Sequence, residues 1–135
     1  MLKVILILSL FIFTSQTEEM LAIKVIEGYF KDINENRWSS VDKWYVNERA
    51  KEIKSFLDNE ENQKKKLGLL NIKSSRLVKL KELPYDYAEQ FLPNRYMEQY
   101  DNKIKKAFYV AVDYNVYHED QYHINGINYF LLFLY

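Results

Sequence analysis

The sequence has no cysteine, only 3 glycines and 2 prolines, and no excess of either charge. Without cysteine, disulfides, thiol catalysis, cysteine-ligated zinc and lipidation of an N-terminal cysteine are excluded. The chain also contains no phosphate loop, no GxGxxG motif and no serine nucleophile elbow. Because 19 basic residues balance 19 acidic ones, general binding to nucleic acid or to an anionic membrane has little support.

What the chain does have is enough apolar material for one folded domain. Its 135 residues suit a single domain and are too few for two. Apolar residues make up 48% of the sequence, including 2 tryptophans, 12 tyrosines and 8 phenylalanines. This composition excludes a disordered chain and predicts a hydrophobic core that needs no disulfide to hold it together.

The first 17 residues have the organisation of a secretory signal peptide. Lys3 supplies the positive charge, Val4 to Phe13 is apolar apart from one serine, and a polar stretch ends at Thr17. An apolar run of this length spans less than about 20 Å as a helix, against about 30 Å for the bilayer core. We therefore expect removal of residues 1–17 and a secreted or envelope-associated domain of residues 18–135. The alternatives are an uncleaved membrane tether and the apolar first strand of a cytosolic domain.

Three helices are predicted in the first half of the mature chain. From residue 18 to residue 34, apolar side chains recur at steps of three and four and form one stripe. A short helix follows, with Ser39 or Ser40 as its N-cap, and a third runs over 47–59. A polar turn is expected over 59–66, where a run of three lysines is interpreted as solvated. The buried residues of the first helix are expected to be Ala22, Val25, Ile26, Tyr29, Phe30 and Ile33.

Strands are predicted in the second half. Residues 70–83 form one long or two short strands, 85–100 form helical turns divided by Pro93, and 104–117 alternate with period two. The fold class is therefore α+β, with N-terminal helices packed on a curved, mainly antiparallel sheet. Asp113 lies on the outer face of the alternating strand, whose predicted core face comprises Phe108, Val110, Val112, Tyr114 and Val116.

Asn125-Gly126 predicts a tight hairpin turn into a returning strand over 127–135. A two-residue turn places Val116 opposite Tyr135 and leaves residues 104–115 without a partner on that side. The uncharged segment Phe130–Tyr135 would then lie at an open sheet edge and favour aggregation. We interpret this as a missing last strand, through C-terminal truncation or through a partner chain that supplies it.

The order of these segments resembles a known family. Gly28-Tyr29-Phe30 near the end of the first helix, Leu69-Leu70-Asn71-Ile72 and the strand Tyr109–Tyr114 with its hairpin partner Gly126–Tyr129 look like the cone-shaped fold of the nuclear-transport-factor-two superfamily, of SnoaL-like or cystatin-like type. The closer resemblance is to secreted domains of unknown function from low-GC Gram-positive bacteria. It implies a curved sheet around the first helix, a pocket at the open end, and relatives that continue into a further long strand.

Two histidines flank a short acidic segment. His118 and His123 are five residues apart, whereas two histidines on one helix face must be four apart, so no shared metal site is predicted. The tight-turn register instead places His118 and Asp120 opposite Phe133 and Leu131, on the continuation of the core face. A proton-shuttling isomerase or dehydratase could use such a pair. The alternative is a longer loop over 118–125 that leaves both groups in solvent.

Aromatic residues supply the candidate ligand contacts. Tyr114, Tyr122 and Tyr129 could form a polar end to an apolar pocket, with Trp38 lining it. The competing interpretation of Trp38 and Trp44 is that they hold the first helix against the sheet. Asp113 is expected to be solvated or paired across the strands.

Three functions follow, in order of preference. The first is an exported non-catalytic domain that binds a small ligand or accompanies an envelope protein. The second is an interaction module whose open edge accepts a strand from a partner or from a second copy, which would form a homodimer. The third is the small enzyme using His118 and Asp120. No cofactor, metal or nucleic acid is expected, and membrane contact is expected only through an uncleaved N-terminal segment.

Overall fold

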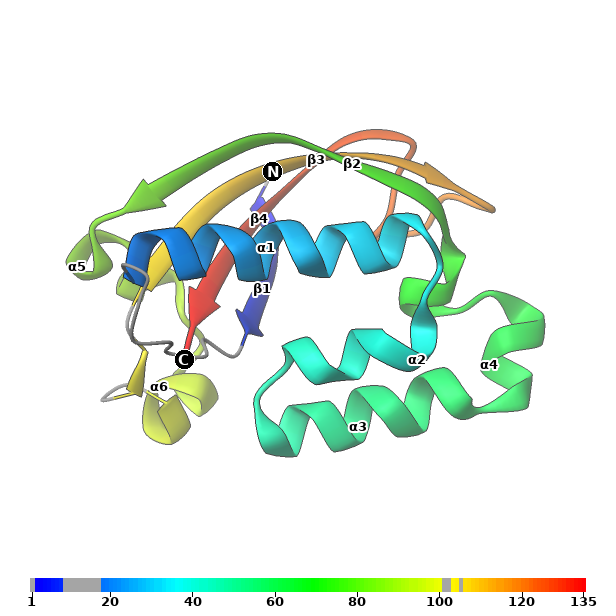
Figure 1. Ribbon diagram of the computed structural model, residues 1–135, viewed down its shortest axis with the longest axis horizontal. Coiled ribbons are helices and arrows are strands. Elements are labelled where there is room, and N and C mark those ends of the chain that lie inside the picture. Colours follow the sequence, from blue (N-terminus) through cyan, green and yellow to red (C-terminus); the bar gives the residue numbers. More distant parts are fainter. Residues whose placement is uncertain (1, 9–17, 101–102, 105) are drawn as a thin grey trace.

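The computed structural model describes residues 2–8, 18–100, 103–104 and 106–135. It has the α+β architecture expected from the sequence, with a sheet that arches over a long helix (Figure 1). The strands are β1 (Leu2–Leu8), β2 (Ile72–Leu83), β3 (Lys106–Val116) and β4 (Gly126–Leu134). The helices are α1 (Glu18–Asn34), α2 (Trp38–Val41), α3 (Asn47–Asp58), α4 (Glu60–Lys65), α5 (Tyr85–Ala88) and α6 (Asn94–Tyr100), with short 3-10 turns η1 (Asp42–Trp44), η2 (Gly68–Asn71) and η3 (Glu89–Phe91).

Helix α1 fills the concave side of the sheet. Its predicted apolar stripe is buried, from Ala22 to Ile33, because spacing of three and four residues places these side chains on the face toward the strands. The side chain of Asn34, at the end of the helix, accepts a hydrogen bond from the Ser75 backbone N–H, and the Ser75 hydroxyl donates to the Phe30 carbonyl. The helix is thus tied to β2 by polar contacts as well as by packing.

Strands β2, β3 and β4 form an antiparallel sheet in which β3 is central. The alternation predicted for β3 is confirmed, since the five residues from Phe108 to Val116 that were assigned to the core are buried against α1. Asp113 lies on the outer face and forms an ion pair with Arg76 of β2, 3.0 Å apart. The period-two pattern therefore identified both faces of this strand correctly.

The predicted hairpin register is wrong. Tyr114 pairs with Gly126 and Lys106 with Leu134, so residues 117–125 form a loop and not a two-residue turn. Gly126 has the positive φ of 91° expected of a turn glycine, but the Asn125 side chain accepts a hydrogen bond from the Val116 backbone N–H and helps to close the wider loop. Residues 106–114, expected to lack a partner, are consequently paired with β4.

β4 does not lie at an open edge of this sheet. The strand order is β1-β4-β3-β2, and β1 runs parallel to β4 with Ile5 opposite Leu131 and Leu8 opposite Leu134. The expectation of an uncovered edge at residues 130–135 is thus wrong for the chain as a whole. The covering strand lies within the segment that the sequence predicts to be a signal peptide, and removal of that segment remains a prediction.

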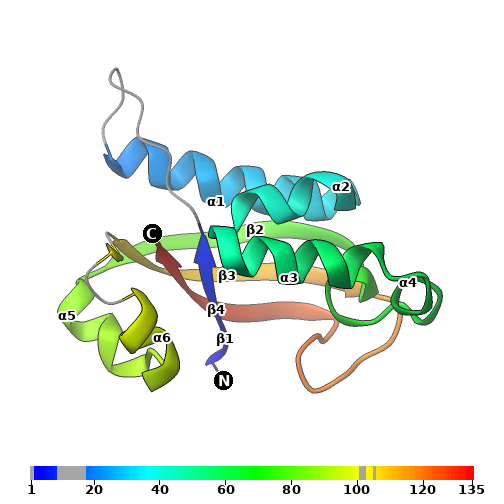
Figure 2. The same cartoon turned by 90° about the horizontal axis from the view of Figure 1, so that it is seen from below.

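β4 is buried on both of its faces. Phe130, Leu132 and Leu134 face α1, whereas Leu131 and Phe133 pack into a second cluster with Ala88 and other residues of the α5–α6 segment. Figure 2 shows α5 and α6 at one end of the sheet and α4 at the other. Two-sided burial explains why this strand is a continuous apolar run without alternation.

The connections between helices differ from the sequence prediction in two places. The short helix begins at Trp38 and has no side-chain cap, so neither Ser39 nor Ser40 is its N-cap. Residues expected to form a polar turn include helix α4, because the side chain of Asn59 accepts a hydrogen bond from the Asn62 backbone N–H and caps it. The other helical predictions are confirmed: α3 covers the predicted third helix, and Pro93 separates α5 from α6.

Candidate functional site

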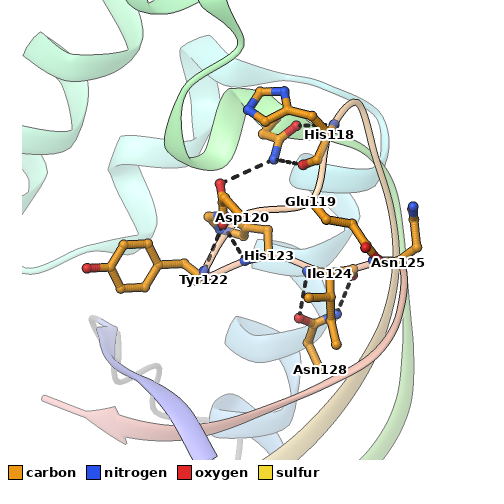
Figure 3. Close-up of polar contacts among 9 residues, drawn as sticks. His118, Glu119, Asp120, Tyr122, His123, Ile124, Asn125 and Asn128 are labelled. Atoms are coloured by element: carbon orange, nitrogen blue, oxygen red, sulfur yellow. Dashed lines mark hydrogen bonds and ion pairs between the residues drawn. The ribbon is translucent and has the colours of Figure 1, made fainter.

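The loop between β3 and β4 holds the predicted acid–base residues, and buried asparagine side chains bind its backbone (Figure 3). Asn71, which is fully buried, donates from Nδ2 to the His118 carbonyl at 2.7 Å and accepts from the His118 backbone N–H at 3.0 Å. The side chain of Asn128 likewise donates to the Ile124 carbonyl at 2.8 Å. The loop is therefore ordered by asparagine side chains that substitute for backbone pairing.

The Asp120 carboxylate is also engaged with the backbone of the loop. Its Oδ1 accepts hydrogen bonds from the N–H groups of Tyr122 and His123, both at 2.7 Å, and the His123 imidazole lies 3.3 Å away. Partial burial raises the pKa of Asp120, but these hydrogen bonds and the charge of His123 outweigh it and leave the pKa below its usual value. A carboxylate held in its charged form by such donors suits a structural role better than that of a general acid.

His118 and Asp120 are not placed as the tight-turn register predicted. Neither residue pairs with Leu131 or Phe133, which lie far along β4 opposite Tyr109 and Ala107. His118 is exposed, and its backbone groups rather than its imidazole bind Asn71. The longer loop of the alternative interpretation is present and His118 is exposed, but Asp120 is half-buried and bound to the loop backbone, not free in solvent. Across the residues that the structure describes, no group of histidines and carboxylates could hold a metal ion.

The role of Asp120 can be tested through stability. We expect Asp120→Ala to lower the free energy of unfolding by about 1–2 kcal/mol at pH 7, because two backbone N–H groups lose their acceptor. A carboxyl whose pKa is depressed by folding stabilises the protein above its unfolded pKa, and this contribution is lost as the pH falls through the folded value. The difference between wild type and variant in urea unfolding should therefore shrink below about pH 4. A difference in unfolding free energy between wild type and Asp120→Ala that stays constant from pH 7 to pH 3 would contradict this role of the carboxylate.

Tyr114 is part of the core and not the rim of a pocket. Its side chain is 4% exposed, and its ring packs against Phe130. Inside the same cluster, the hydroxyls of Tyr29 and Tyr45 are 2.5 Å apart and hydrogen-bonded. Burial raises the pKa values of Tyr29 and Tyr114, and it raises the pKa of Tyr45 to about 12. All three phenols therefore stay protonated at neutral pH.

The remaining predicted contact residues do not converge. Tyr122 is exposed at the tip of the loop, and Tyr129 lies on the outer face of the sheet. Trp38 packs against the core beneath α1. Trp44 donates its indole N–H to Asp32 at 2.7 Å and covers Gly28, where a Cβ would approach its ring to 2.5 Å. The structure brings no ligand site together from Tyr114, Tyr122, Tyr129 and Trp38, and Trp44 holds the η1 turn against α1.

A shallow groove lies between α1 and β2. It has a volume of about 220 Å³ and is lined by Glu27, Phe30 and Lys31 of the helix with Ser75 and Leu77 of the strand. Its polar groups include Ser75, whose hydroxyl already donates to the Phe30 carbonyl. The groove is small for a drug-sized ligand, so it is a weak candidate for the functional site.

The two strands that flank the antiparallel sheet differ in how their outer edges are protected. β2 has register shifts near Ser74 and Lys79 and carries exposed lysines, features that discourage pairing with another strand. β4 has no charged residue between Gly126 and Leu134, and its outer edge is covered only by β1 among the described elements. The edge of β4 is thus the surface of this fold most suited to accept a strand.

Comparisons with protein-family models, with curated proteins and with solved structures find no match for this chain. Within the described part of the chain, no helix is long and apolar enough to cross a bilayer.

Proposed function

We propose that this protein is an exported, non-catalytic interaction domain that binds its partner by accepting a β-strand along β4. The proposal takes residues 1–17 to be a signal that is removed. It is carried by one observation: the edge of β4 that β1 covers is apolar and has no charged residue or proline to prevent pairing. Loss of β1 would leave this edge ready for another strand.

The chemistry of the partner strand follows from that of β4. Phe130 to Leu134 are all buried, on two faces of the sheet, so a strand beside them extends both apolar layers. β1 pairs in the parallel direction through a segment whose only charged residue is Lys3. We infer that the partner supplies a mostly apolar strand, from an envelope protein or from a second copy of this domain.

Catalysis by His118 and Asp120 receives no support from this geometry. The two groups lie in a surface loop, and the Asp120 carboxylate is occupied by two backbone N–H donors. A small-ligand function is likewise not favoured, because the predicted contact residues are dispersed over the core, the loop and the outer face.

Strand acceptance can be tested in the full-length chain with Leu6→Pro. Proline in the middle of β1 removes a backbone donor and disrupts its pairing, so the edge of β4 becomes available. We expect the variant to keep its far-UV circular dichroism and to bind a fluorescent peptide of residues 2–8 with solubilising lysines at its end. Wild type, whose edge is occupied, should bind at least about tenfold more weakly, as expected for a competing intramolecular strand.

Leu2→Pro is the matched control, since proline is tolerated at the first position of a strand. It should behave as wild type does. A folded Leu6→Pro variant that remains monomeric and does not bind the peptide would contradict the proposal. The export step is checked separately, by the mass of the chain recovered outside Gram-positive cells that express it: a product beginning near residue 18 is expected, and retention of residues 1–17 would argue against it.

A further inference from the structure

Lysines and tyrosines from separate segments meet on the outer face of β2 and β3. At one end, Lys66 follows helix α4 and Lys73 lies on β2, and their Nζ atoms are 5.1 and 4.9 Å from the centroid of the Tyr117 ring. At the other end, the Nζ of Lys79 is 6.0 Å from the centroid of Tyr109, and Lys81 is the cross-strand partner of Tyr109.

These positions form a line that we call the lysine–tyrosine stripe: Lys66, Lys73, Lys79, Lys81, Tyr109 and Tyr117. Tyr109 lies on β3 and Tyr117 directly follows its last residue, and eight residues of extended chain span about 26 Å. Between them, Arg76 neutralises Asp113. None of the four lysines forms an ion pair with a carboxylate of the described residues, so the stripe keeps four positive charges.

We propose that the lysine–tyrosine stripe binds a linear anionic glycan, with carboxylate or phosphate groups at the lysines and sugar hydroxyls at the tyrosines. The occupant must be elongated, because the charges lie along one line and not in a pocket. It must also carry repeated negative charge, because the free cations occur at both ends of the line. The site is separate from the edge of β4 and does not depend on strand acceptance.

Two other polyanionic partners fit the stripe less well. A flat bilayer would touch only part of it, because β2 and β3 arch over α1 (Figure 1) and Lys79, Lys81 and Tyr109 lie on the sheet face away from that helix. A single-stranded nucleic acid binds by stacking its bases on free aromatic faces. Here lysine ammonium groups lie over the rings of Tyr109 and Tyr117, and the Tyr109 ring also stacks on that of Tyr129, with centroids 5.8 Å apart. These ring faces are therefore not free for bases. The phenolic hydroxyls can still hydrogen-bond to sugars.

The test compares two variants of the full-length chain with equal net charge. One replaces all four lysines of the stripe (K66Q, K73Q, K79Q and K81Q). The control replaces four exposed lysines elsewhere (K24Q, K43Q, K51Q and K64Q). Binding of polygalacturonate is measured by fluorescence anisotropy at low and at physiological salt, with neutral dextran, single-stranded DNA and phosphatidylserine vesicles as the other probes.

We expect the wild type and the control to bind polygalacturonate equally, and more weakly as salt rises. Each exposed ion pair is worth up to about fivefold in affinity, so loss of all four should weaken binding by about tenfold or more. Adding Y117A to the stripe variant should weaken polygalacturonate binding further, because it removes the ring that Lys66 and Lys73 contact. Equal loss in both quadruple variants, no binding by the wild type, or tighter binding to DNA or vesicles would overturn the proposal.

Discussion

Replacing Phe133 with alanine is expected to lower the free energy of unfolding by about 3–5 kcal/mol, the usual cost of truncating a fully buried phenylalanine. Its side chain is 0% exposed and lies on the outer face of β4 beneath the α5–α6 segment, among Ala88, Leu92 and Tyr100. The rigid strands on either side cannot close the cavity, so the lost contacts are not recovered. For a domain whose total stability is about 5–15 kcal/mol, this is a large fraction.

The measurement is urea unfolding followed by circular dichroism, with Tyr129→Ala as the matched control. Tyr129 lies on the same face of the same strand but is 37% exposed, so its truncation should cost less than about 1.5 kcal/mol. Equal effects of the two substitutions would show that α5 and α6 do not cover the outer face at Phe133.

Replacing Asn71 with alanine should have the next largest effect, a loss of about 2–4 kcal/mol. The side chain is 0% exposed and makes two hydrogen bonds to the backbone of His118. Its removal leaves a donor and an acceptor without their partner, and each unsatisfied buried group costs about 1–3 kcal/mol. Because Asn71 is the link between the start of β2 and the loop, the local structure of residues 117–125 should loosen as well.

Two readouts distinguish this effect from general destabilisation. Amide hydrogen exchange should rise first in the loop, at His118 and Tyr122, before it rises in β3. Glu119→Ala is the control in the same loop: Glu119 is exposed and accepts one hydrogen bond, from the Asn125 N–H, so its loss should cost no more than about 1 kcal/mol. A similar cost for both variants would refute the anchoring role of Asn71.

Short-range sequence patterns correctly predicted the helix α1 and the strand β3. Spacing of three and four residues identified α1 and its buried face, and period two identified the inner face of β3. Asp113 was placed on the outer face by the same parity, where it pairs with Arg76. These predictions succeed because the periods of helix and strand are properties of the backbone itself and need no knowledge of the partner.

The prediction of a tight hairpin failed because the connection depends on a residue that is distant in the chain. Asn125-Gly126 is a strong turn signal, but the wider loop is stabilised by Asn71, which lies more than 40 residues earlier in the chain and hydrogen-bonds to His118. The predicted positions of His118 and Asp120 were wrong as well, because they were derived from this register. Asn71 carries no local mark of this role, because a buried asparagine and a solvated one look the same in a sequence.

The sequence by itself determined the α+β class, the long helix, the faces of β3 and the absence of cysteine and phosphate-loop chemistry, since each depends on composition or on short-range periodicity. Only the tertiary structure decided the register of β4, its cover by β1, the surface position of the candidate acid–base pair and the meeting of Lys66, Lys73 and Tyr117. These features join residues distant in the chain, and which distant segments meet is set by the packing of the whole core and not by any local pattern.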